Sequence, residues 1–495
     1  MSFCPMRMAM SQVREISFPG ATVLDVRPTS STLSFSLYEA EVAEGESVVA
    51  VDWGDGSVVM YAPDADRRVS LSHAYSRAGT YSVRIQDRLS RLVYSHAAPA
   101  AADTFSETLT PFDGARALHG VESVGSAVQN RMLSYGMFCN TGIESAPSGY
   151  SAPLISSVNS SARMVPFGCF HGCANLTSVA GLDLTGVVAV DAWAFAGCSG
   201  LPDLSAFSGC KLLHVGPCAF SACTSLKSVD GLAGSALADG CDSSLFAGAS
   251  SVSYHGSTFR VLDECDTIAA DLDPDGGMYD DYSRYLRAQH FLMGLGERAF
   301  EQCTSLESVA ALKSFSGVLV PGTFSQCSSL VTVPDELVAK QGAGYHQESY
   351  VNGMACYAFV HTGAIPVYAH VRVTPEEPVY GRQWVQGGTF DGCPASNVVN
   401  GKSPVVVGGQ YAGCTGITDV KFSCTSTALS IGSGAFAGCT ALRAVRFPKY
   451  TMSQVIAAGQ PALNGYGCLA SNRRYPFDLP SGCVIYCSDG NLTVS

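Results

Sequence analysis

The stretch AFAGCTALRAV, residues 435–445, contains the spacing that decides the fold. Phe436, Cys439, Leu442 and Val445 are each three residues apart, and the phrase returns along most of the chain at intervals near 25 residues. A fixed period of this size is the signature of a solenoid, in which each repeat needs neighbours to bury its apolar face. The other clear copies carry Phe170 and Cys173, Phe195 and Cys198, Phe220 and Cys223, Phe300 and Cys303, Phe324 and Cys327, and Tyr411 and Cys414.

Within one repeat, the three-residue spacing places the Phe, Cys and Leu side chains on one face of a 3-10-like turn. The phrase then ends in alternation, as in Val445 and Phe447, which predicts a short strand with both side chains on one face. Each repeat is therefore expected to form a tight turn, a short strand and a return. Less complete copies stand at Phe138, Phe246, Phe359 and Phe390.

The motif Ala-Phe-x-x-Cys-x-x-Leu-x-x-Val, clearest at 435–445, 219–229 and 299–309, resembles the leucine-rich repeats of BspA-type surface proteins. This resemblance implies a mainly β fold with short helical turns: a parallel-sheet solenoid over residues 116–495 with a role in adhesion or binding. It brings no catalytic residues with it. The period lengthens where we expect insertions, near 254–298, 335–358 and 366–388.

Residues 18–92 follow a different pattern, with alternating runs that predict short antiparallel strands. The phrases VDWGDGS at 51–57 and HAYSRAGTYSV at 73–83 resemble a polycystic-kidney-disease (PKD) type β-sandwich, which implies a spacer or attachment module. Asp52 and Asp55 favour a hydrogen-bonded turn over a calcium site. Residues 1–17 would be an N-terminal extension, and the Ala-, Pro- and Thr-rich residues 93–115 a linker and entry to the solenoid.

Composition and charge exclude several classes of partner and site. The net charge is −13 and no basic run occurs, so we expect no nucleic-acid partner. No apolar stretch is long enough for a membrane span, and the N-terminus lacks the apolar core of a standard signal peptide. Because the repeat cysteines share one register, we expect them to be reduced and buried, rather than in disulfides or a zinc site with Cys169 and His171.

Candidate sites fall in the insertions and on the strand face. Asp271, Asp273 and Asp275 open like a calcium loop, but Tyr282 stands where a ligating Glu is needed, which favours a solvated acidic loop and no cofactor. The aromatic residues of the insertions could anchor a ligand or pack on the coils. The binding candidates are Tyr279, Tyr282, Tyr380 and Trp384 in the insertions, and Ser178, Ser228, Ser308, Thr332, Asp419, Lys421 and Arg446 beside the inward-facing Val positions.

The sequence therefore indicates a non-enzymatic recognition or adhesion protein that binds a host-surface protein or glycan. A microbial cell surface and a phage virion are both possible settings, and the virion needs no signal peptide. An intracellular interaction scaffold is one alternative, and a glycan-active enzyme with its site in the insertions is another. No nucleophile elbow, P-loop, dinucleotide fingerprint or zinc-protease motif occurs, so we expect no catalysis.

Overall fold

The chain is mainly β with few helices, and it forms two compact units. The computed structural model describes residues 16–99, 109–154, 162–237, 294–340, 389–458 and 478–494, except for gaps at 217, 297, 318, 320–321, 403–404, 407–409, 426–428 and 432–433. Between these ranges it describes five strands, all in the expected insertions apart from the first residues of β16: β16 (Ser251–Tyr254), β17 (Ser257–Arg260), β18 (Gln347–Val351), β19 (Met354–Ala358) and β20 (Val371–Val373). Unit 1 contains 1–153, 163–187 and 193–201, and unit 2 contains the remaining residues.

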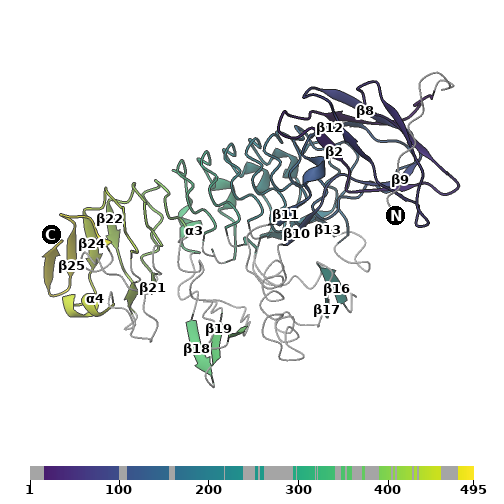
Figure 1. Ribbon diagram of the computed structural model, residues 1–495. Helices are drawn as coiled ribbons and strands as arrows, with labels where there is room; N and C mark the ends of the chain where they lie inside the picture. Colours follow the sequence, from purple (N-terminus) through teal and green to yellow (C-terminus); the bar gives the residue numbers. More distant parts are fainter. Residues whose placement is uncertain are drawn as a thin grey trace. The chain divides into compact units, whose positions relative to one another are not determined.

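The N-terminal part of unit 1 contains sheets of five, three and two strands, ordered β12-β1-β8-β4-β5, β6-β3-β9 and β2-β7 (Figure 1). Alternating burial in β1 and β8 shows one face of the large sheet turned to the core and the other to solvent. Trp53 is completely buried, with its ring stacked 5.0 Å from that of His73. The strands are β1 (Thr22–Val26), β2 (Ser34–Ser36), β3 (Glu39–Val42), β4 (Val49–Asp52), β5 (Val58–Tyr61), β6 (Arg68–Val69), β7 (Ser72–Ala74), β8 (Tyr81–Ile85) and β9 (Leu89–Val93).

The fifth strand of the large sheet, β12 (Leu118–Ser123), comes from after the expected linker and pairs antiparallel with β1. Before it, β10 (Ala97–Pro99) pairs with β11 (Leu109–Pro111), and the 3-10 turn η2 (Asp113–Ala115) follows. The buried ring of Tyr94 stacks on that of Phe138, 5.0 Å away, in the first coil. The domain boundary at 93–115 stays a prediction, but strand pairing and ring stacking join the two sides of it within unit 1.

The repeat phenylalanines form ring stacks inside the coils of each unit. In unit 1, Phe138, Phe170 and Phe195 lie with successive ring centroids 5.2 Å apart. In unit 2, the corresponding distances are 5.5 Å from Phe220 to Phe300, 5.6 Å from Phe300 to Phe324 and 5.5 Å from Phe324 to Phe390. All of these rings are fully buried, so each coil covers the apolar face of the next, as the period predicts.

The insertions leave the stack between adjacent coils. Phe220 packs directly on Phe300 and Phe324 directly on Phe390, although about 80 and 66 residues separate them in the sequence. No coil can therefore lie between these rings. The expectation that Phe246 and Phe359 begin further coils of the stack is wrong, although both residues lie outside the described part of the chain. The doubled period reflects one coil plus an inserted segment.

Each repeat cysteine joins its coil to the preceding one. The Sγ of Cys173 lies 2.9 Å from the carbonyl oxygen of Phe138, and Cys303 Sγ lies 3.2 Å from that of Phe220. The thiol is the donor, since a carbonyl oxygen can only accept. The prediction that these cysteines are free and buried is confirmed for all eight in the register: Cys173, Cys198, Cys223, Cys303, Cys327, Cys393, Cys414 and Cys439.

Two left-handed positions recur in the described coils, two residues before and two after the aromatic ring. Glycine often fills them, as at Gly168 and Gly172 around Phe170. Trp193, Ala222 and Arg298 stand in the same conformation, with φ of 53°, 57° and 55°. A side chain in this region costs about 1 kcal/mol, so several coils contain backbone strain that glycine would relieve.

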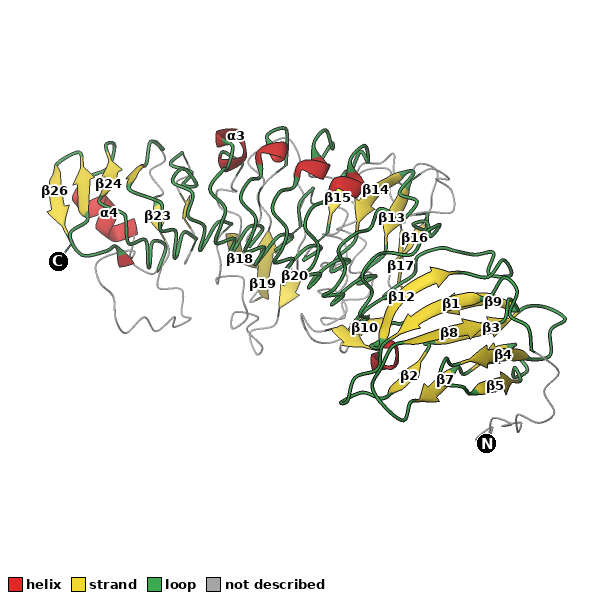
Figure 2. Ribbon diagram, turned by 90° about the horizontal axis from the view of Figure 1, so that it is seen from above, coloured by secondary structure: helices red, strands yellow, loops and turns green. Residues whose placement is uncertain are grey.

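The strand side of unit 2 ends in a four-stranded sheet, β22 (Asp419–Lys421), β24 (Ala444–Phe447), β25 (Val484–Cys487) and β26 (Gly490–Thr493) (Figure 1). The first three strands are parallel and β26 is antiparallel. Helical turns follow the strand positions along one edge of the coils, where Figure 2 shows α3 (Asp335–Val338). No described helix is long and apolar enough to cross a membrane. The other elements are β13 (Arg163–Val165), β14 (Val187–Val190), β15 (His214–Val215), β21 (Val405–Val406), β23 (Ser430–Ile431), η3 (Ser205–Phe207), η4 (Asp230–Leu232), η6 (Ala310–Leu312) and α4 (Met452–Ala458).

Candidate recognition face

The hydroxyl side chains predicted to point outward stand on parallel bridges between coils. Ser178 bridges to Ser145 in unit 1, and Ser308 bridges to both Ser228 and Thr332 in unit 2. The hydroxyl oxygens of Ser178 and Ser308 each accept a hydrogen bond from the backbone N–H two residues later, at 3.2 Å. These serines are therefore local turn caps as well as surface groups, which sequence analysis missed.

The C-terminal sheet brings Asp419, Lys421 and Arg446 together on one face. Lys421 and Arg446 are in register, and the Nη2 of Arg446 lies 3.0 Å from Asp419 Oδ2. The guanidinium carbon of Arg446 also lies 4.4 Å from the ring centroid of Tyr486. The hydrogen bond to Asp419 raises the pKa of Arg446. Arg443 donates instead to the backbone oxygen of Thr440, 2.8 Å away, so two of the basic groups at this end are engaged locally.

The candidates in the insertions lie outside the described residues. They are Tyr279, Tyr282, Tyr380 and Trp384, together with the acidic positions Asp271, Asp273 and Asp275. Their roles stay predictions.

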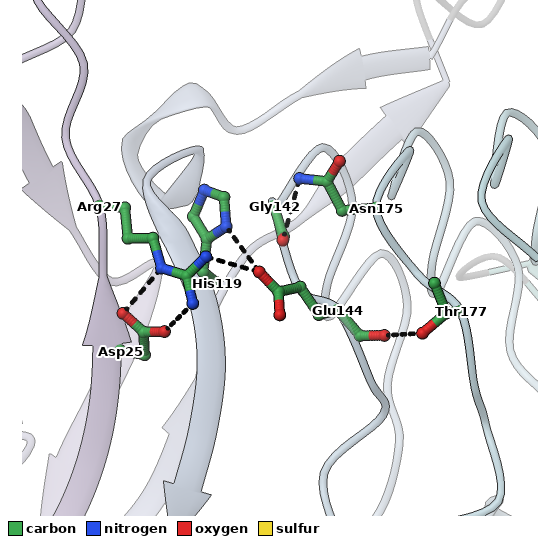
Figure 3. Close-up of polar contacts among 7 residues, drawn as sticks. All are labelled: Asp25, Arg27, His119, Gly142, Glu144, Asn175 and Thr177. Atoms are coloured by element: carbon green, nitrogen blue, oxygen red, sulfur yellow. Dashed lines mark hydrogen bonds and ion pairs between the residues drawn. The ribbon is translucent and has the colours of Figure 1, made fainter. Parts of the chain in front are cut away.

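Arg27 connects the N-terminal sheet to the first coil. Its Nη2 lies 2.6 Å from Asp25 Oδ2, and its Nη1 lies 2.5 Å from Glu144 Oε1 (Figure 3). Hydrogen bonds to Asp25 and Glu144 raise the pKa of Arg27. One guanidinium thus holds two carboxylates, one on β1 and one on the first coil, so their relative position within unit 1 is fixed.

The backbone is continuous across the same place. The N–H of Glu144 donates to the carbonyl oxygen of His119 on β12 at 3.1 Å, and the N–H of Thr177 donates to that of Glu144 at 2.9 Å. The side chain of Thr177 donates to the same oxygen, and Asn175 donates to the carbonyl of Gly142 (Figure 3). The N-terminal sheet therefore passes by hydrogen bonds through β12 into the first coils.

His119 fills the space above Gly142. A Cβ atom on that glycine would lie 2.6 Å from the Nε2 of His119, so only glycine leaves room for the ring. The Nδ1 of His119 is buried without a hydrogen bond, and its nearest charged neighbour is Glu144 Oε1 at 3.8 Å. The imidazole thus helps to position Glu144 without bonding to it.

The ion pairs extend across the outer face of the large sheet. Arg84 on β8 pairs with Asp52 on β4, to which it is directly opposite in register. On the next strand, Asp25 is opposite Ser82 of β8. The name "charged row" is used below for the resulting alternation of carboxylates and guanidiniums: Asp52, Arg84, Asp25, Arg27 and Glu144.

Sequence analysis found none of the charged row. One signal was available, because Asp25 and Arg27 alternate with buried Leu24 and Val26 and so must face solvent on strand β1. Glu144 carried no such signal. It lies in the eroded first coil, where Thr141 replaces the repeat cysteine and Ile143 comes one residue earlier than the regular Leu. Its proximity to Arg27, 117 residues away, depends on the tertiary fold.

The cysteines form packing contacts rather than a reactive centre. Burial raises the pKa of the Cys139 thiol to about 12, and the Nδ1 of His171 lies 3.7 Å from its Sγ. A buried neutral thiol is a poor nucleophile and a poor ligand. Within the part of the chain that the structure describes, no group of three His, Cys, Asp or Glu side chains could hold a metal ion. The described surfaces therefore support non-covalent recognition.

Comparison with known proteins identifies the repeats. Residues 155–250 and 386–457 match the family described as BspA type leucine rich repeat region, in six copies. The chain carries BspA-type leucine-rich repeats. A leucine rich cell surface protein from Faecalibacterium prausnitzii A2-165 has a solved structure that is 15% identical to this chain and covers 71% of it and 88% of its own length. The TM-score is 0.18, which is too low to carry an argument. No curated protein matches the chain.

Proposed function

We propose that this chain is a non-enzymatic recognition protein, in which a PKD-like β-sandwich precedes a BspA-type leucine-rich-repeat solenoid. One observation carries the proposal: the interior of the coils is completely filled. Phe, Cys and Leu at the repeat positions of the described coils are at most 1% exposed, which leaves no cavity there for a substrate. The variable chemistry lies on the outward residues of the bridges and sheets, the part of a repeat protein suited to a partner.

The partner we propose is a protein or glycan on a cell surface. A microbial surface or a phage virion would supply the setting, and the repeat family favours the surface. An intracellular scaffold and a glycan-active enzyme with its site in the insertions are the alternatives. Fractionation of the native protein would distinguish a surface location from an intracellular one, and glycan turnover would reveal the enzyme.

The test is a protein and glycan array together with intact cells, probed with the full chain. A double variant, Ser308→Arg with Thr332→Arg, places two bulky cations on the bridge face of unit 2. Binding should fall by about tenfold or more, because buried hot spots lose 2 kcal/mol or more when disrupted. Glu336→Arg, on helix α3, is the matched control, and circular dichroism checks that both variants fold. If neither variant changes binding to any target, the bridge face is not the recognition surface.

A further inference from the structure

The outer face of the large sheet of unit 1 differs from the bridge face in its chemistry. The bridge face presents mainly hydroxyls, whereas the charged row alternates three carboxylates with two guanidiniums across β4, β8, β1 and the first coil. The N–H of Glu144 hydrogen-bonds to β12, so this alternation continues directly into the coils that carry Thr177 and Ser178. A spacer module has no need of such a surface.

The charged row is already organised before any partner arrives. Arg27 is held at both ends, and its side chain is 38% exposed. Asp25 and Asp52 are only 15% and 14% exposed, whereas Glu144 is 54% exposed. Side chains that are fixed in advance lose little conformational entropy on binding, which favours affinity.

Resting on the proposed function, we propose that the recognition face extends onto the N-terminal module, and that its charged row binds a polypeptide that places a lysine or arginine against Glu144. The row has a net charge of −1, and the second carboxylate oxygen of Glu144 has no partner among the described residues. The chain as a whole carries −13, which steers a basic partner toward it.

The alternation selects the class of partner. A neutral glycan would have to displace water from paired charges and return only hydroxyl contacts, and a polyanionic glycan is repelled by the net charge. A polypeptide can oppose both signs along one strand of contacts, and such complementarity sets register and specificity. The polypeptide is therefore the occupant that fits this face.

The experiment uses the full chain and three matched sets of short synthetic peptides, with lysine, glutamine or glutamate at the same alternating positions. The lysine set should bind, and binding should weaken greatly at about 1 M salt, where the screening length is near 3 Å. Glu144→Gln, which keeps an oxygen acceptor for Arg27, should weaken binding by about tenfold. Glu307→Gln, an exposed carboxylate on the bridge face of unit 2, is the control and should change nothing.

Each outcome decides the inference. If the glutamine or glutamate set binds as tightly as the lysine set, or if Glu144→Gln binds like the wild type, the inference is wrong. If cells or glycans bind the full chain and that binding responds to the bridge-face variant but not to Glu144→Gln, the inference fails and the proposed function stands. If no target binds at all, both fail.

Discussion

Cys303 donates its thiol hydrogen to the carbonyl oxygen of Phe220, 83 residues earlier in the chain, across 3.2 Å. The same contact recurs in neighbouring coils, from Cys327 to Phe300 at 3.1 Å and from Cys393 to Phe324 at 3.1 Å. The cysteine thus fills a small apolar space and also satisfies a carbonyl that stacking would leave buried. This dual role explains why the insertions can grow between adjacent coils without disturbing their contact.

Cys303→Ala should lower the free energy of unfolding by about 1–3 kcal/mol, because it leaves a small cavity and removes one buried hydrogen bond. Urea denaturation of the full chain measures the change. Cys487→Ala, at a half-buried cysteine outside the register, is the control and should cost much less. Burial raises the pKa of Cys303 well above its ordinary value, so alkylation of the native protein at neutral pH should miss this thiol. Equal costs for the two variants would contradict the thiol ladder.

Ala222→Gly should stabilise the protein by roughly 0.5–1 kcal/mol. Ala222 has φ of 57°, and the equivalent residue in other coils is often glycine, which adopts that conformation without strain. Ala219, three residues earlier, is buried in an ordinary conformation, so Ala219→Gly should destabilise. Thermal unfolding followed by circular dichroism should shift in opposite directions for the two variants. A shift in the same direction would show that strain at Ala222 is not the deciding factor.

The repeat contacts were predictable from sequence, whereas the contacts of the eroded first coil were not. Phe170, Cys173 and Leu176 announce their burial by period alone, since a residue that recurs in one register must meet its copies. Two things escaped. The Sγ–carbonyl bond depends on which way the cysteine side chain turns, and the copies at Phe246 and Phe359 matched the motif loosely enough to mislead. The pairing of Arg27 with Glu144 joins two patterns that have no common period.

A cut between Pro99 and Leu109 should leave the two fragments associated. Beyond the cut, β12 pairs with β1 over Val23 to Val26, and Tyr94 stacks on Phe138 with both rings fully buried. A protease site introduced between residues 99 and 109, followed by gel filtration of the cleaved protein, tests this. Adding Tyr94→Ala should weaken the association, because a large buried aromatic contributes several kcal/mol. Release of a free, folded C-terminal fragment would instead support a domain boundary at 93–115.

Unit 1 should lose stability as the pH falls below about 6.5. Burial lowers the pKa of His171 and of His96, so the folded protein holds fewer protons on these rings than the unfolded chain does. Their contribution is complete above the ordinary histidine pKa and is lost as the pH falls through it. His171→Gln should flatten the dependence of the unfolding midpoint on pH between about 7 and 5, and His119→Gln controls for loss of an imidazole in the same unit. An unchanged slope in His171→Gln would exclude this residue as the source.

Two aspartates of unit 2 should respond to pH in opposite ways. Burial raises the pKa of Asp391, whose Oδ2 accepts a hydrogen bond from Gln326 at 2.8 Å and whose Oδ1 is buried without a partner. The folded protein therefore holds this proton more readily than the unfolded chain, and stability is lost as the pH rises through about 3.9. Asp391→Asn should then stabilise the protein by roughly 1–2 kcal/mol at neutral pH and change little near pH 3.

Asp203 is the matched case with the reverse sign. Hydrogen bonds from the side chain and backbone of Ser205, the latter 2.8 Å long, lower the pKa of Asp203 where it precedes η3. Its contribution is present above the ordinary carboxyl pKa and is lost as the pH falls, so Asp203→Asn should destabilise slightly at neutral pH, by a few tenths of a kcal/mol. Urea unfolding of both variants at pH 3 and pH 7 measures the two effects together. If Asp391→Asn also destabilises at neutral pH, the orphaned Oδ1 must be satisfied in solution by a donor such as a bound water, which the amide cannot replace.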